Sequence, residues 1–308
     1  MKDSEKRRLL ESLEVLRRPN GFFSDPTAKI VDEPYLIFGI GGSGREIAAK
    51  VKQKAADTFL PSECQQKLGI RVMDSHHGEL ESAEEEGVFT TEEIIKLPYQ
   101  GVYESFPNNP FVTPFLPEGF QGTIKDRDGF KGTGAAATPL TGRILLTSDG
   151  AVNLLKEKIK SVVNMLMKPN ALGTPSRLHI VFVLSFAGGM GTGSIVDTTY
   201  IMKRILQESN IQYDMACYAL TPFACHDDSK EKANFIATLK TVLHFMNLSE
   251  TERRFSHTYA PGFTVDTNES IFYTLFLVDG SQTGNSSKDF HGLAVETVSR
   301  SIIQTMTK

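Results

Sequence analysis

The chain has 308 residues, of which 40% are hydrophobic and 23% charged, and its formal net charge at pH 7 is −4. These values are typical of a globular protein and give no general attraction to nucleic acid or anionic membranes. The three cysteines are odd in number and unevenly spaced, residues 1–18 lack the apolar core of a secretory signal, and no apolar run has the length of a membrane segment. We therefore expect a cytoplasmic protein.

The N-terminal region carries leucines 9, 10, 13 and 16 at helical spacing. This pattern predicts a short amphipathic helix over 4–17, followed by a linker rich in glycine, serine and proline. We divide the chain into this helix and linker, residues 1–33, and one domain over 34–308.

From residue 35 onward, predicted strands and helices alternate. The strands are expected over 35–38, 70–73, 178–185, 215–220 and 271–278, and the helices over 45–60, 151–167, 195–207, 229–246 and 290–305. Such alternation predicts an α/β fold of three layers, with a mainly parallel sheet covered by helices on both faces. Ligands of such sheets bind at the carboxyl ends of the strands.

Residues 76–130 interrupt this alternation and are expected to form a surface insertion. They contain an acidic run over 79–86, a predicted short helix over 91–96 and several prolines. We interpret the acidic run as a solvated surface, with a partner-binding surface as the alternative. His76 and His77 are interpreted as surface polar residues, not as a ligand pair.

The first glycine-rich segment, residues 39–44, follows the first predicted strand. By itself it fits the dinucleotide fingerprint G-x-G-x-x-G, which would make the chain an oxidoreductase with Asp74 on a ribose. Asp74 follows the last glycine by about thirty residues, where the fingerprint expects about twenty. The P-loop motif does not occur in the sequence.

Two further glycine-rich segments, residues 132–143 and 187–194, are expected at the ends of other strands. The segment 187–194 has four glycines in eight residues and precedes a predicted helix. Glycine lets successive backbone N–H groups turn toward one concavity, and the positive end of the helix dipole favours bound phosphate. Together the three segments predict a site for a polyphosphate nucleotide.

In this order the three segments resemble the motifs of the tubulin/FtsZ superfamily. Residues 187–194 are similar to G-G-G-T-G-[ST]-G, with Ala187 for the first glycine and Met190 for the first threonine. Residues 132–143 resemble the FtsZ form G-x-G-A-[GA]-x-N-P-x-x-G-R, with Thr138 for asparagine, and residues 41–47 resemble the tubulin form G-Q-C-G-N-Q-I. The resemblance covers about residues 34 to 305. It implies a tubulin-like nucleotide-binding domain that binds GTP or GDP with Mg²⁺.

The resemblance also implies a role for each segment. Residues 41–43 would lie along the α- and β-phosphates, residues 134–137 would approach the γ-phosphate, and residues 188–193 would wrap the phosphate tail, with a hydrogen bond from the Thr192 hydroxyl. Asp74 would face the phosphates or their Mg²⁺. The implied nucleotide-binding residues are Gly41, Gly42, Ser43, Gly44, Gly134, Ala135, Ala136, Ala137, Thr138, Gly188, Gly189, Met190, Gly191, Thr192, Gly193, Pro222, Phe223 and Lys230.

Near the expected ribose site, residues 221–223 resemble the family element T-x-P-F with one residue missing. The family's glutamate and arginine after this element are His226 and Lys230 here. On the last predicted helix, which the resemblance makes the central helix, no aromatic and asparagine pair matches the family, and Glu296, Arg300 and Gln304 stand there instead. Guanine is therefore implied by the family alone.

A metal site was also considered around the last two cysteines. Cys217, Cys225, His226, Asp227 and Asp228 are of metal-binding types, but their spacing matches no zinc pattern. We interpret Cys217 as part of a strand and Cys225 as part of a loop.

Hydrolysis in polymerising members of the superfamily depends on an acidic loop after the central helix, which this sequence does not contain. The second, α+β domain is also not seen, so no catalytic residue is expected in this chain. We predict the GTP-binding domain of a prokaryotic filament-forming GTPase that self-associates or binds a related subunit, from a longer chain. The alternatives are a non-hydrolysing nucleotide-binding interaction module, with the acidic insertion binding a partner, and a dinucleotide-dependent oxidoreductase.

Overall fold

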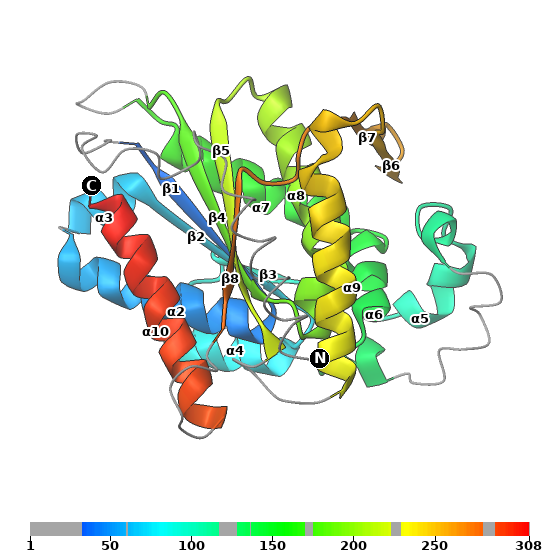
Figure 1. Cartoon of the computed structure of the whole chain (residues 1–308), viewed down its shortest axis with the longest axis horizontal. Coiled ribbons are helices and arrows are strands. Elements are labelled where there is room, and N and C mark those ends of the chain that lie inside the picture. The colour runs from blue at the N-terminus through cyan, green and yellow to red at the C-terminus, as the bar shows by residue number, and fades with distance from the viewer. Residues whose placement is uncertain are drawn as a thin grey trace, which may run out of the picture.

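The computed structural model describes residues 33–59, 61–116, 128–135, 137–169, 175–222, 229–279 and 287–307 (Figure 1). The helix predicted over 4–17 lies outside these residues. Within the described helices, none has both the length and the apolar character needed to span a membrane.

A parallel sheet of six strands forms the centre of the domain. The strand order is β3-β2-β1-β4-β5-β8, and every neighbouring pair is parallel. The strands are β1 (Tyr35–Ile40), β2 (Leu68–Asp74), β3 (Ile94–Lys96), β4 (Leu178–Ser185), β5 (Tyr213–Leu220) and β8 (Thr274–Val278). All residues of β1 and β4 are buried, as expected for central strands covered on both faces.

The register brings three strand ends to the same level. Ile40, the last residue of β1, lies beside Met73 on β2 and Leu184 on β4. The residues that follow these strands therefore meet at one edge of the sheet.

Helices cover both faces and confirm the three-layer α/β fold (Figure 1). The helices are α2 (Gly41–Thr58), α3 (Pro61–Lys67), α4 (His77–Glu85), α5 (Val102–Ser105), α6 (Pro139–Thr147), α7 (Ala151–Leu166), α8 (Gly189–Glu208), α9 (Ser229–Met246) and α10 (Ser287–Met306). One apolar core joins α2, α4 and α10 to one face of the sheet, and a second core joins α6, α7, α8 and α9 to the other face. A small hairpin, β6 (Phe255–Ala260) with β7 (Phe263–Thr267), packs on the second core.

The structure corrects one predicted element and changes the bounds of several others, among them the strand predicted over 271–278, which begins only at Thr274. The helix predicted over 91–96 is wrong, because Ile94 and Ile95 are buried in β3 at the sheet edge, where β-branched residues pack well. Helices α2 and α8 begin at Gly41 and Gly189, inside the glycine-rich segments that were expected to be loops. The hairpin, α3, α4 and α6 were not predicted.

Candidate functional site

A cavity of about 230 Å³ lies where the three glycine-rich segments meet at the carboxyl ends of the strands. Its lining comes from the ends of β1, β2 and β4, from the starts of α2, α4 and α8, and from the segment before α6. The lining residues are Ile40, Gly41, Gly42, Ser43, Asp74, His76, Glu79, Gly134, Ala135, Ala137, Ser185, Gly188, Gly189, Met190 and Gly191.

Two long helices begin at this cavity. Helix α2 starts at Gly41, directly after β1, and α8 starts at Gly189, with three residues between it and the end of β4. The first amides of a helix have no partner within the helix, and the helix dipole places partial positive charge there. Both helix starts therefore favour an anion in the cavity.

The third segment is held against the end of β2 by backbone contacts. Thr133 forms an isolated antiparallel bridge with His76, and the N–H of His77 donates to the carbonyl of Gly132 at 2.8 Å. Gly134 has a φ of +92° and Ala137 a φ of +51°. The backbone of this segment therefore turns sharply at two residues that both line the cavity.

Asp74 brings a buried carboxylate to the cavity. Its side chain accepts the N–H of Ser75 at 2.7 Å and that of His76 at 3.3 Å, and only 5% of the residue is exposed. Burial raises the pKa of Asp74 above its ordinary value, while the two backbone hydrogen bonds partly oppose the shift. A second carboxylate, Glu79 on α4, forms an ion pair with Arg45 on α2 at 2.6 Å.

Several glycines of the motifs pack helices together and do not line the cavity. A Cβ at Gly193 would collide with the carbonyl of Pro139, and one at Gly142 would lie 2.6 Å from the carbonyl oxygen of Gly189. Helices α6 and α8 thus touch backbone to backbone. Gly44 plays the same part between α2 and β4, because a Cβ there would collide with the carbonyl of Val183.

The other predicted residues lie near the cavity but not in its wall. Thr192 directs its hydroxyl to the carbonyl of Gly188, so the structure does not present the free donor that was expected. Thr138 accepts a hydrogen bond from Nζ of Lys230 at 3.3 Å, and Pro222 is buried at the end of β5. Ala136 and Phe223 lie outside the described residues.

Sequence reasoning missed several residues that the structure brings to the cavity. His76 was expected on the surface, but it lines the cavity beside Gly134. Glu79 was assigned to the solvated acidic run and is exposed, and its ion pair with Arg45 also holds its carboxylate beside the start of α2. Their position directly after β2 was the available signal, because that is where a parallel sheet places ligand-facing residues.

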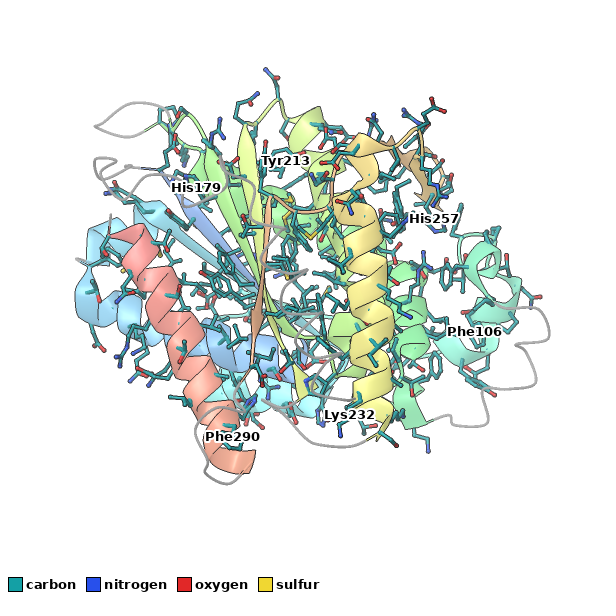
Figure 2. All side chains as sticks on the ribbon, in the orientation of Figure 1. Phe106, His179, Tyr213, Lys232, His257 and Phe290 are labelled. Carbon is teal, nitrogen blue, oxygen red and sulfur yellow. The ribbon has the colours of Figure 1, made fainter. Side chains whose placement is uncertain are left out.

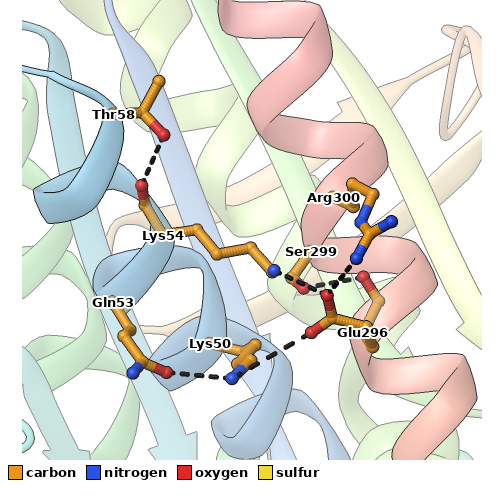
Figure 3. A network of polar contacts seen from close by, with 7 residues as sticks. All are labelled: Lys50, Gln53, Lys54, Thr58, Glu296, Ser299 and Arg300. Atoms are coloured by element: carbon orange, nitrogen blue, oxygen red, sulfur yellow. Dashed lines mark hydrogen bonds and ion pairs between the residues drawn. The ribbon is translucent and has the colours of Figure 1, made fainter.

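Helix α10 presents Glu296 to α2. Glu296 accepts hydrogen bonds from Lys54 at 2.7 Å and from Arg300 at 2.8 Å, and Lys50 lies 4.0 Å away (Figure 3). Lys54 and Arg300 lower the pKa of Glu296, with Lys54 contributing most. Glu296 therefore joins two helices and does not line the cavity.

No cluster of three or more histidine, cysteine or carboxylate side chains is arranged to hold a metal ion among the described residues. Cys217 is fully buried in β5, as its strand assignment predicted, and burial raises its thiol pKa. Residues 225–228 lie outside the described part of the chain.

Comparisons with known proteins agree with this architecture. A family model described as "Tubulin like" matches residues 36–308. No match was found among curated proteins. Similar solved structures include a GTPγS-form protofilament of TubZ from Bacillus thuringiensis serovar israelensis, with a TM-score of 0.51, 14% identity and coverage of 89% of this chain and 57% of that chain. A helical model of the TubZ-Bt two-stranded filament has a TM-score of 0.53 and 14% identity, covering 89% of this chain and 54% of that one.

An FtsZ W319Y mutant from M. jannaschii has a TM-score of 0.50 and 14% identity, over 99% of this chain and 62% of that one. At this identity the likenesses show the fold, and the chain spans between 54% and 62% of the length of these three structures. The fold, the strand order and the match over residues 36–308 lead to one assignment: the chain belongs to the tubulin-like family.

Proposed function

We propose that this chain is the GTP-binding domain of a filament-forming GTPase of the tubulin/FtsZ type, acting in the cytoplasm. The observation that carries the proposal is the convergence of three glycine-rich segments on one cavity, at the edge of the sheet where two helices begin. Family membership supports guanine as the base and nucleotide-coupled self-association as the function.

The charges around the cavity are suited to a phosphate that arrives with a cation. Asp74 and Glu79 line the cavity, whereas no lysine or arginine does so among the described lining residues. Mg²⁺ prefers one or two carboxylates together with phosphate oxygens. Asp74 is the side chain that would hold it, and the ion would neutralise phosphate charge next to these carboxylates.

Self-association is proposed from the family, since the two TubZ neighbours are a protofilament and a two-stranded filament. We infer that residues 134–137 approach the γ-phosphate and that the segment 132–143 couples nucleotide state to assembly. Residues 76–130 are proposed as a surface insertion with a solvated acidic helix, α4, and in the alternative interaction module this helix is the surface that would contact a protein partner.

A nucleotide titration tests the proposal. We expect GTP and GDP with Mg²⁺ to raise the melting temperature, and ATP and NADH to leave it unchanged. A thermal shift with NADH and none with GTP would contradict the proposal and revive the dinucleotide alternative. Pelleting with GTP, compared with GDP, tests assembly separately.

A second candidate is a nucleotide-binding interaction module that does not hydrolyse. Met190 favours it, because its buried, apolar side chain lines the cavity where the family motif has threonine. This candidate predicts tight GTP binding with no release of phosphate, even after a full-length relative with the acidic loop is added.

A further inference from the structure

Asn234, on α9, contacts two of the glycine-rich segments at once. Its Nδ2 donates to the carbonyl oxygen of Ala137 at 2.9 Å and to that of Ala187 at 3.0 Å. Ala137 belongs to the segment before α6, and Ala187 to the segment before α8. These two residues are 50 positions apart in the sequence.

The chemistry of the side chain makes this contact specific. A side-chain amide nitrogen carries two hydrogens, so one group can serve both carbonyls, and two carbonyl acceptors fix which side of the amide faces them. Only 9% of Asn234 is exposed. Buried carbonyl groups that lose such a donor pay the cost of desolvation.

The backbone at one end of the contact needs support. Ala137 has a φ of +51°, which is uncommon for a residue with a side chain and persists where the surroundings impose it. The bond from Asn234 holds the carbonyl of this same residue. One turn earlier on α9, Lys230 donates to Thr138 of the same segment, so two positions of α9 bind this turn.

We propose that Asn234 is a positioning residue that clamps residues 134–138 to residues 187–191 and fixes the two walls of the cavity relative to each other. The proposal rests on the proposed function for its nucleotide, although the clamp itself is a property of the free protein. Because residues 134–137 are expected beside the γ-phosphate, the clamp favours GTP over GDP.

The test compares Asn234→Leu and Asn234→Asp, which keep approximate size and remove both donors, with Val242→Ala as the control. Val242 is fully buried on the same helix and its side chain has no group that could hydrogen-bond to either segment, so its variant reports loss of α9 packing alone. Hydrogen exchange is measured on the nucleotide-free proteins, over the amides of Thr138 and Ala187. These donate to Ala135 and to the Ser185 hydroxyl in the native structure.

We expect exchange in both segments to rise by roughly fivefold to tenfold in the two Asn234 variants, because each segment loses one ordinary hydrogen bond, and to change little in the control. Affinity for GTP should fall by about tenfold and affinity for GDP by less than about threefold. Faster exchange in one segment only, or equal effects in the control, would overturn the clamp. If the wild-type protein binds neither nucleotide, the proposed function fails, while the exchange measurement still decides on Asn234.

Discussion

The two edges of the sheet each hold a cavity, and the larger one is at the edge without the glycine motifs. At the amino ends of β5 and β8, a cavity of about 520 Å³ is lined by side chains, among them Lys203, Gln207, Tyr213 and Glu269. At the opposite edge, the cavity of about 230 Å³ is lined mainly by glycine and alanine. Figure 2 shows Tyr213 and His179 at the first edge, and Lys232 and Phe290 at the second.

Polar groups at the first edge already satisfy one another. The carboxylate of Glu269 accepts hydrogen bonds from Gln207 at 2.8 Å, Tyr213 at 3.0 Å and Lys203 at 3.3 Å. At the glycine-rich edge, two helix starts face the cavity together with Asp74 and Glu79, whose carboxylates bind the Ser75 and His76 amides and Arg45. Volume alone therefore favours the edge whose polar groups bind one another, whereas the helix starts favour the smaller cavity as the candidate anion site.

The largest loss of stability is expected when a glycine at the glycine-rich edge is given a side chain. Gly193→Ala should lower the free energy of unfolding by about 3 kcal/mol or more, since its Cβ meets the Pro139 carbonyl and neither helix backbone can yield cheaply. Chemical denaturation measures the effect.

Gly188→Ala is the matched control, because a Cβ at this position meets no atom within 4 Å. Its φ of −76° is also open to alanine. The cost should be about 1 kcal/mol or less, the range for an N-cap change. Equal losses in the two variants would show that α6 and α8 are not in backbone contact.

Asp74→Asn tests nucleotide and Mg²⁺ binding at the cavity itself. We expect GTP affinity in the presence of Mg²⁺ to fall by roughly 100-fold, and the remaining binding to be insensitive to EDTA. Stability should be unchanged or higher, because the raised pKa shows that the fold disfavours the charged form, and asparagine can still accept both backbone N–H groups. Calorimetric titration with and without EDTA measures the first effect. A destabilised variant with normal, EDTA-sensitive binding would contradict the assignment.

Much of the fold follows from the sequence because the central strands have clear hydrophobic patterns. The strand over 178–185 is a continuous apolar run, and it was placed at its observed bounds. The segment 91–96 failed because its two apolar residues fit either a helix or a strand, and only pairing with β2 decides between them. The hairpin over 255–267 was missed, although buried Phe263 and Val265 alternate with polar residues directly after a Pro-Gly turn, which is the local signal of a hairpin.

The candidate site was predictable at the level of segments, not of atoms. Glycine density identified three segments, but it does not distinguish Gly188, which faces the cavity, from Gly193, which packs against α6. Asn234 carried no local signal, because it acquires its role from partners far away in the sequence. His76 was marked only by its position directly after β2, and its bridge to Thr133 is also distant in the sequence.

At the edge without glycine motifs, the two members of the ion pair should differ in cost. Glu269→Gln leaves the ammonium of Lys203, whose side chain is only 7% exposed, without its carboxylate, and we expect a loss of about 2 kcal/mol. Lys203→Met leaves a carboxylate that is 45% exposed and keeps two other donors, so about 1 kcal/mol or less is expected. Urea unfolding measures both, and nucleotide affinity should stay unchanged in each. A change in GTP affinity would mean that the two edges are coupled.

The smallest effect concerns His257, which links the hairpin to the segment after α5. Its Nε2 contacts the carbonyl of Phe111 at 3.1 Å, and burial lowers its pKa below the ordinary value of 6.5, against the opposing influence of Asp197. The unfolded chain therefore takes up this proton first as the pH falls.

The contribution of neutral His257 to stability is complete above pH 6.5 and decreases below it, by at most about 1.4 kcal/mol per pH unit. In His257→Gln, the free energy of unfolding should fall less between pH 7.5 and pH 5.5 than in the wild type. Because Arg143 also acts on His257 and packs over Phe115, GTP affinity measured over the same pH range shows whether this hairpin contact reaches the segment before α6. A wild-type slope in the variant would show that burial of His257 does not govern this part of the pH dependence.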